Sequence, residues 1–198
     1  MAKIGLKYPK YAVATVTTNA SGVETETFGT VKTAGRAISA DISVNAADAK
    51  FYADDGVAET DREFIDGTIT MSVDELAAET VSELCGTELE TPSGDLVSGE
   101  NDTAPYVRFG FIVPKMVRGV RKWMGLVFMR VKFAEPEDSY ETKGESVTFA
   151  GTNITGDIMK NPAGHWKRRS ADKTTEADAV SWLEAALVAA DPAVSNGG

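Results

Sequence analysis

The sequence of 198 residues contains a single cysteine, Cys85, and a single histidine, His165. One cysteine excludes a disulfide within the chain and a zinc site built on several cysteines, and one histidine excludes every motif that needs two. The longest apolar run near the middle, residues 123–129, is about a third of the ~20 residues that cross a bilayer. The N-terminus also lacks the apolar core of a signal peptide. We therefore expect no membrane partner and no export directed by this sequence.

Basic residues are scarce. The chain has 20 lysines and arginines against 30 acidic residues, which gives a net charge of −10. A protein with this net charge is poorly suited to binding nucleic acid, because the affinity of such binding comes largely from basic side chains that neutralise backbone phosphates. Residues 1–105 hold seven basic and 19 acidic residues, whereas the remainder is nearly neutral. This charge asymmetry fits head-to-tail association, in which the acidic surface of one copy meets the neutral or basic surface of the next. The alternative is that residues of both halves are interspersed in the fold, so that the surface shows no difference in charge.

What the sequence does contain is mostly the two-residue periodicity of strands with one exposed face. Five segments either alternate in this way or flank a turn-forming tetrapeptide typical of a hairpin: residues 11–18, 24–31, 38–44, 65–71 and 107–113. Residues 147–159 predict a further strand, with a bulge at Gly151. The sequence thus predicts an α+β domain, mainly β, built as a two-sheet antiparallel sandwich or barrel with flanking helices.

Two segments predict those helices. The first begins at Ser72, where Glu75 completes a capping box, and ends at Gly86. The second begins near Thr175 and is stopped by Pro192. Each carries apolar residues at helical spacing, which indicates packing against the sheet.

The segment of residues 123–133 differs from the other strands, because its middle is apolar on both faces and must be covered on both sides. A packed helix can supply one cover and a neighbouring subunit the other. The two cations of this strand are expected to meet acidic residues of a partner. The candidate subunit-interface residues are Trp123, Leu126, Phe128, Arg130 and Lys132.

Two segments, residues 45–63 and 87–104, predict long surface loops. We expect a single domain over residues 1–192 and a flexible tail at 193–198. The first loop and the residues beside it are rich in carboxylates, but their spacing misses the EF-hand pattern, so a solvated acidic loop is preferred to a calcium site.

No motif predicts catalysis. The sequence has neither a phosphate-binding loop nor a dinucleotide-binding glycine pattern. A serine or cysteine nucleophile would need His165 as its base, and no nearby carboxylate in the sequence suggests an orienting partner. Cys85 is most simply a small buried hydrophobic residue. We expect no catalytic, metal-binding or cofactor-binding residues, and therefore no enzyme.

Three segments resemble the major tail tube proteins of long-tailed (siphovirus-type) bacteriophages: residues 1–9, 48–55 and 67–76. The resemblance runs over most of the chain, and its most specific part is the run Ala-Lys-Phe-Tyr-Ala-Asp-Asp at residues 49–55, followed by a strand and a capped helix. It implies a β-sandwich or barrel subunit with no enzymatic activity and no cofactor. Such subunits assemble into stacked six-membered rings, and the hollow tube conducts the genome into the host.

The resemblance also implies partners and a location. The partners are further copies in homohexameric rings and the tape-measure, tail-terminator and tail-tip proteins, while phage DNA passes without specific binding. The location is the virion tail, after assembly in the host cytoplasm. The alternative is a subunit of a related non-phage tube, from a secretion system or a tail-like bacteriocin.

Within such a tube, subunits would join their strand edges, and an acidic face would line the bore. Wall charge acts on passing phosphates only at short range, because the screening length at physiological salt is ~8 Å. The candidate bore-lining residues are Glu24, Glu26, Asp41 and Asp66.

Overall fold

The computed structural model describes residues 2–3, 5–22, 24–53, 56–136 and 151–191. The expected class is confirmed, because strands dominate and two helices flank them. Neither helix of the described part is both long and apolar enough to cross a membrane.

The main sheet is antiparallel and has ten strands, with the path β3-β2-β9-β10-β11-β6-β5. In that order its strands are β3 (Glu24–Phe28), β2 (Lys7–Thr18), β9 (Val107–Val117), β10 (Val120–Phe133), β11 (Thr152–Met159), β6 (Gly56–Val73) and β5 (Ala37–Ala53). Three short strands extend it, namely β1 (Ala2–Lys3) on β9, β4 (Lys32–Thr33) on β2 and β12 (Lys167–Arg169) on β10. A second, two-stranded sheet joins β7 (Glu88–Leu89) to β8 (Leu96–Val97).

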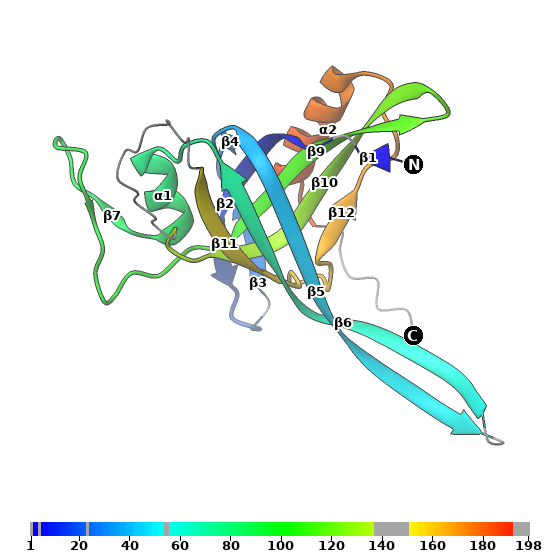
Figure 1. Ribbon diagram of the computed structural model, residues 1–198. Helices are drawn as coiled ribbons and strands as arrows, with labels where there is room; N and C mark the ends of the chain where they lie inside the picture. The colour runs from blue at the N-terminus through cyan, green and yellow to red at the C-terminus, as the bar shows by residue number, and fades with distance from the viewer. Residues whose placement is uncertain (1, 4, 23, 54–55, 137–150, 192–198) are drawn as a thin grey trace, which may run out of the picture.

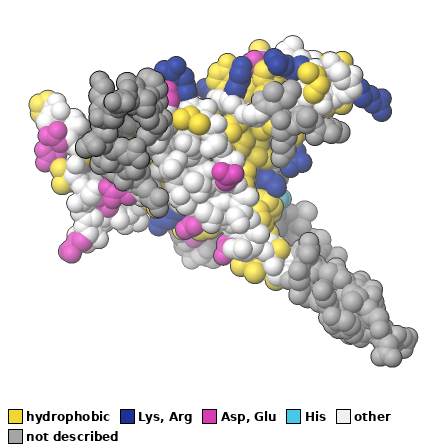
Figure 2. Space-filling model, in the orientation of Figure 1, with side chains coloured by type: hydrophobic (Ala, Val, Ile, Leu, Met, Phe, Trp, Pro, Cys, Tyr) yellow, Lys and Arg dark blue, Asp and Glu magenta, His cyan; other side chains and the backbone are white. Residues whose placement is uncertain are grey.

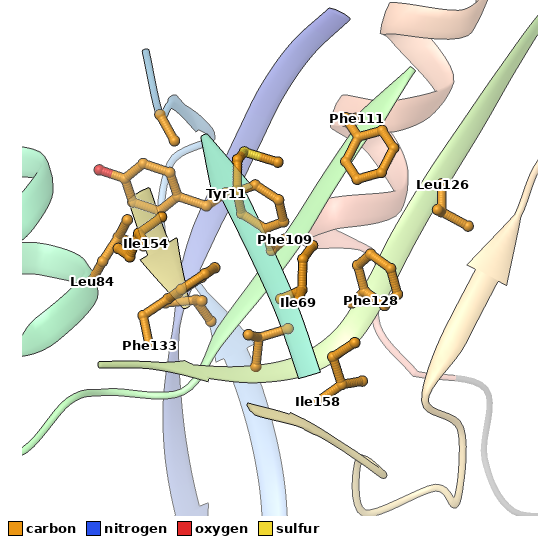
Figure 3. Packing of buried hydrophobic residues seen from close by; sticks show 14 of the residues in the cluster. Tyr11, Ile69, Leu84, Phe109, Phe111, Leu126, Phe128, Phe133, Ile154 and Ile158 are labelled. Carbon is orange, nitrogen blue, oxygen red and sulfur yellow. The ribbon is translucent and has the colours of Figure 1, made fainter. Parts of the chain in front are cut away.

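The core lies on the inner face of the main sheet. Tyr11 of β2 and Met71 of β6 belong to one buried cluster although three strands separate them along the path, so the sheet curls around its own side chains. Phe109 and Phe128 fill the middle, and Leu84 of helix α1 (Ala78–Cys85) closes one side (Figure 3). The apolar residues of the alternating pattern that predicts the strands are the ones that form this inner face.

Helix α2 (Glu176–Val188) covers the outer face of β9 and β10. Leu183 and Leu187 are fully buried there against Val127 and Met129. The prediction that β10 is covered on both faces is confirmed. Both covers come from the same chain, however: α2 on one side and the core on the other.

Glycines let α2 approach the sheet closely. A Cβ atom at Gly125 of β10 would clash with the indole ring of Trp182, and one at Gly110 of β9 would lie 2.7 Å from Cδ1 of Leu183. Because these positions have no side chain, the helix packs directly against the backbone of the sheet.

The helix ends test the predicted caps. Thr175 Oγ1 accepts a hydrogen bond from the Asp178 backbone N–H at 3.1 Å, so the predicted start of α2 is confirmed. Helix α1 ends at Gly86, which is left-handed with φ 77°, also as predicted. The predicted start of α1 is wrong, because Ser72 belongs to β6 and the helix begins only at Ala78.

Residues 45–53 and 56–63 do not form a loop. They belong to a hairpin in which β5 and β6 pair from Ala37 opposite Val73 to Ala53 opposite Gly56. The hairpin projects well beyond the body of the protein (Figure 1). By contrast, residues 87–104 are a mostly exposed segment in which the short β7–β8 ladder is the regular structure described. The first part of the strand predicted at 147–159 lies outside the described residues, and β11 begins at Thr152.

Candidate assembly surfaces

The outer edge of β5 is open. One side of this 17-residue strand pairs with β6, and no other described strand pairs with its opposite side. An edge of this length presents unpaired backbone N–H and C=O groups that can pair with another chain. Three apolar side chains of β5 are also partly exposed: Ile38 by 60%, Ile42 by 39% and Val44 by 42%. The edge thus offers both backbone hydrogen bonds and apolar contact.

The other end of the sheet path is also open. Strand β3 has five residues and pairs only with β2 among the described strands. A subunit with one open edge at each end of its sheet can join like copies head to tail. If each copy is rotated by the same angle relative to the last and the series returns to its start, the copies form a closed ring.

One face of β5, β6 and β11 is polar and lies outside the area covered by α2. The strand register places Asp41 opposite Thr70, Thr70 opposite Thr155, and Asp66 opposite Asn45. Asp41 and Asp66 are exposed, and the Asn45 amide donates to Asp66 Oδ1 at 2.6 Å. The surface over these strands is largely uncharged, with separate acidic side chains (Figure 2). Two of the four candidate bore-lining residues therefore share an accessible face.

Glu24 and Glu26 are placed differently from that pair. The guanidinium of Arg130 lies 3.0 Å from Glu24 and 2.7 Å from Glu26, and it stacks 4.1 Å from the ring centre of Tyr106. The Glu26 side chain is only 1% exposed, so it does not face solvent. Burial raises the pKa of Glu26, while the charge of Arg130 acts in the opposite direction. Glu26 is thus a buried ion-pair partner rather than a wall residue, and only Glu24 of the two is accessible.

The candidate interface residues on β10 also need correction. Trp123, Leu126 and Phe128 are buried inside the chain, with at most 7% exposure, so their side chains are not available to another subunit. Arg130 meets acidic residues of its own chain instead of a partner's. Lys132 is half-buried, with its Nζ 5.5 Å from the ring centre of Tyr106. Burial of β10 by its own chain accounts for the apolar pattern that suggested an interface.

Opposite charges gather at different parts of the molecule. Residues 87–105 include no lysine or arginine and five carboxylates: Glu88, Glu90, Asp95, Glu100 and Asp102. Lysine and arginine side chains gather instead along the upper edge of Figure 2, toward the β9–β10 turn with Arg118, Arg121 and Lys122. The acidic β7–β8 segment and the basic β9–β10 turn therefore lie on different elements of the described fold.

Two features escaped sequence reasoning. Arg108 lies in an alternating strand at a position expected to be exposed, yet it is fully buried between the ring of Phe28 and an ion pair with Asp191. A groove between β12 and the end of α2 is lined by Met129, His165, Lys167, Arg168, Ala189 and Ala190. Both depend on residues far apart in the chain, and the basic run at 167–169 was the only local signal.

Neither of the two reactive residue types lies in a catalytic arrangement. Cys85 is buried, donates from Sγ to the Ala134 carbonyl oxygen at 3.3 Å, and has a pKa raised to about 11 by burial. His165 is exposed and makes no ion pair with a carboxylate in the part of the chain that the structure describes. The described residues also contain no cluster of three potential metal ligands. Most side chains of the acidic segment weighed for calcium lie outside the described residues.

No protein-family model matches the chain, and a search of curated proteins finds no significant match. Function is therefore argued from the surfaces described above.

Proposed function

We propose that this protein is a structural virion protein, the subunit of a phage tail tube, and that it self-assembles into stacked six-subunit rings. The hollow stack is the conduit for DNA ejection into the host. The observation that carries the proposal is the open edge of β5 with its exposed apolar side chains. The proposal that the assembly is a tail tube comes from the sequence resemblance at residues 1–9, 48–55 and 67–76.

The open edges explain why copies associate. An isolated sheet with a long unprotected edge is prone to uncontrolled pairing, which proteins normally prevent with charges, prolines or a covering element. Among the described side chains of β5, Asp41 is the one charged residue, and Ile42 and Val44 beside it are apolar and exposed. Pairing with a neighbouring copy satisfies the backbone groups and removes these side chains from water, so the edge becomes a specific contact.

The uncovered polar face explains how DNA passes. Asp41 and Asp66 give a wall of like charge to the phosphates, and the uncharged threonines beside them offer no strong binding site. Repulsion limited to ~8 Å keeps the duplex off the wall without preventing its entry. Lysines in the same positions would hold the phosphates and slow transit.

The test is a matched pair of substitutions at equally exposed valines. Val44 on the β5 edge is 42% exposed and Val188 on α2 is 43% exposed. We expect Val44→Lys to abolish rings and tubes, because an edge lysine opposes strand pairing. Val188→Lys should assemble like the natural protein. Negative-stain electron microscopy of concentrated protein, with tail-tip proteins added as initiators, provides the readout, and circular dichroism checks that both variants fold.

Two results would contradict the proposal. Tubes formed equally well by the Val44→Lys variant would show that the β5 edge is not a contact. Absence of any ring or tube from the natural protein, with and without initiators, would remove the assembly function itself.

A further inference from the structure

The groove between β12 and the end of α2 is amphipathic. Its volume is about 460 Å³, and Met129, Ala189 and Ala190 form an apolar part beside the cationic side chains of Lys167 and Arg168. A concave surface with an apolar floor and a charged rim suits a segment that carries both apolar and oppositely charged side chains.

One cation of the groove, Arg168, has no acidic partner within the described residues. Arg168 and Arg169 make no ion pair within the described part of the chain, and Arg168 lies 5.8 Å from the ring centre of Trp182. Asp191, just beyond the groove-lining alanines, is already paired with the buried Arg108. Arg168 is therefore the groove cation that can meet a carboxylate of a partner.

The β7–β8 segment, residues 87–104, has the complementary character. Leu96 and Val97 are 38% and 45% exposed, although both are apolar and lie in the short ladder. Five carboxylates surround them with no basic residue in between. This acidic arm extends from the α1 side of the molecule, whereas β12 lies at the opposite side of the view (Figure 1). No described residue of the arm lines the groove of its own chain.

We infer that the acidic arm of one copy docks into the β12–α2 groove of the next. This contact rests on the proposed function, since it requires that like copies assemble, and it names a second attachment besides the β5 edge. Leu96 and Val97 cover the apolar floor, while carboxylates such as Asp95 meet Arg168 at the rim. The contact is heterologous, because it joins the arm of one copy to the groove of another. Since every copy carries both surfaces, the same contact can repeat around a ring. Charge complementarity fixes which end of each copy meets the other.

Disulfide trapping tests the geometry. In a Cys85→Ser background, which keeps a donor to the Ala134 carbonyl, Leu96→Cys is combined with Ala190→Cys. We expect mild oxidation of assembled protein to give a ladder of linked species, because each copy carries both halves of the contact. The control combines Leu96→Cys with Val120→Cys, at a 55% exposed site beside the β9–β10 turn, and should give no ladder.

Charge reversal tests the energetics. Arg168→Glu and Asp95→Arg should each weaken association at least about tenfold in sedimentation at low salt, and the double variant should recover much of the loss. Intact rings with no Leu96–Ala190 ladder and no effect of either reversal would overturn this contact and leave the proposed function standing. Occupation of the groove by the chain's own residues 192–198 would give that same result. A natural protein that stays monomeric under every condition would overturn both.

Discussion

The ion pair between Arg108 and Asp191 joins the main sheet to the end of α2. Arg108 is 0% exposed, and its guanidinium also donates to the carbonyl oxygens of Ala186 and Ala189. Substituting Asp191→Asn removes the negative partner and keeps the shape of the side chain. Removal of one partner from a buried pair destabilises strongly, because the remaining charge has no compensation and no access to water.

The structure sets the size of this effect. Loss of one partner of a fully buried pair costs about 3–5 kcal/mol. Asp191 keeps 17% side-chain exposure, so we expect the lower end, about 3 kcal/mol. With a urea m-value of about 2 kcal/mol/M, the unfolding midpoint falls by about 1.5 M. Urea titration followed by tryptophan fluorescence measures this shift.

The controls separate charge from general damage. Asp41→Asn removes an exposed carboxylate and should change the free energy of unfolding by no more than about 0.5 kcal/mol. Adding Arg108→Met to Asp191→Asn should recover part of the loss, because no unpaired charge is then buried. A midpoint unchanged by Asp191→Asn, or a double variant whose losses simply add, would refute the assigned role of the pair.

Two further predictions concern the interior. The raised pKa of Glu26 means that the folded state holds its proton more tightly than the unfolded chain, so the contribution of Glu26 to stability is greatest below the unfolded value of about 4.5 and is lost as pH rises through the folded pKa. Between pH 4 and 7 the urea midpoint of the natural protein should therefore fall relative to that of the Glu26→Gln variant; identical profiles would refute the assignment. Gly125→Ala inserts a methyl group against Trp182 and should cost about 1–3 kcal/mol with a shifted tryptophan emission, whereas a neutral result would mean that α2 does not pack this closely.

Local patterns predicted the elements whose determinants are local. The alternation in residues 107–113 lies within β9, and Thr175 caps α2 because its hydroxyl reaches the Asp178 N–H three residues on. The capping-box pattern at Ser72 failed for a tertiary reason. Asp74 Oδ1 instead accepts from the backbone N–H groups of Arg36 and Glu75, which fixes a turn between β6 and α1.

The long β5–β6 hairpin could not be predicted from alternation. The pairing register shifts between Asn45 and Ala46 and again between Phe51 and Tyr52. A register shift of this kind interrupts the regular alternation between the two faces of a strand. A period-two pattern is therefore interrupted inside a continuous strand. The composition of the segment 45–63 is that of a loop, although its described residues are paired.

The candidate site was predicted only where exposure follows from the strand pattern. Asp41 and Asp66 lie on the polar face that alternation indicated. Glu26 and the β10 residues were misjudged because their surroundings come from distant segments: Arg130 is 104 positions beyond Glu26, and α2 covers β10 from residues 176–188. The groove beside β12 has the same origin, since it joins β10, β12 and the end of α2.

The most direct test of the central claim is a cryo-electron microscopy map of the assembled particle. We predict that the β5 edge of every copy lies against a strand of its neighbour, and that the face carrying Asp41 and Asp66 surrounds an open channel. A particle in which the β5 edge faces solvent, or in which that polar face lies on the outside, would contradict the account.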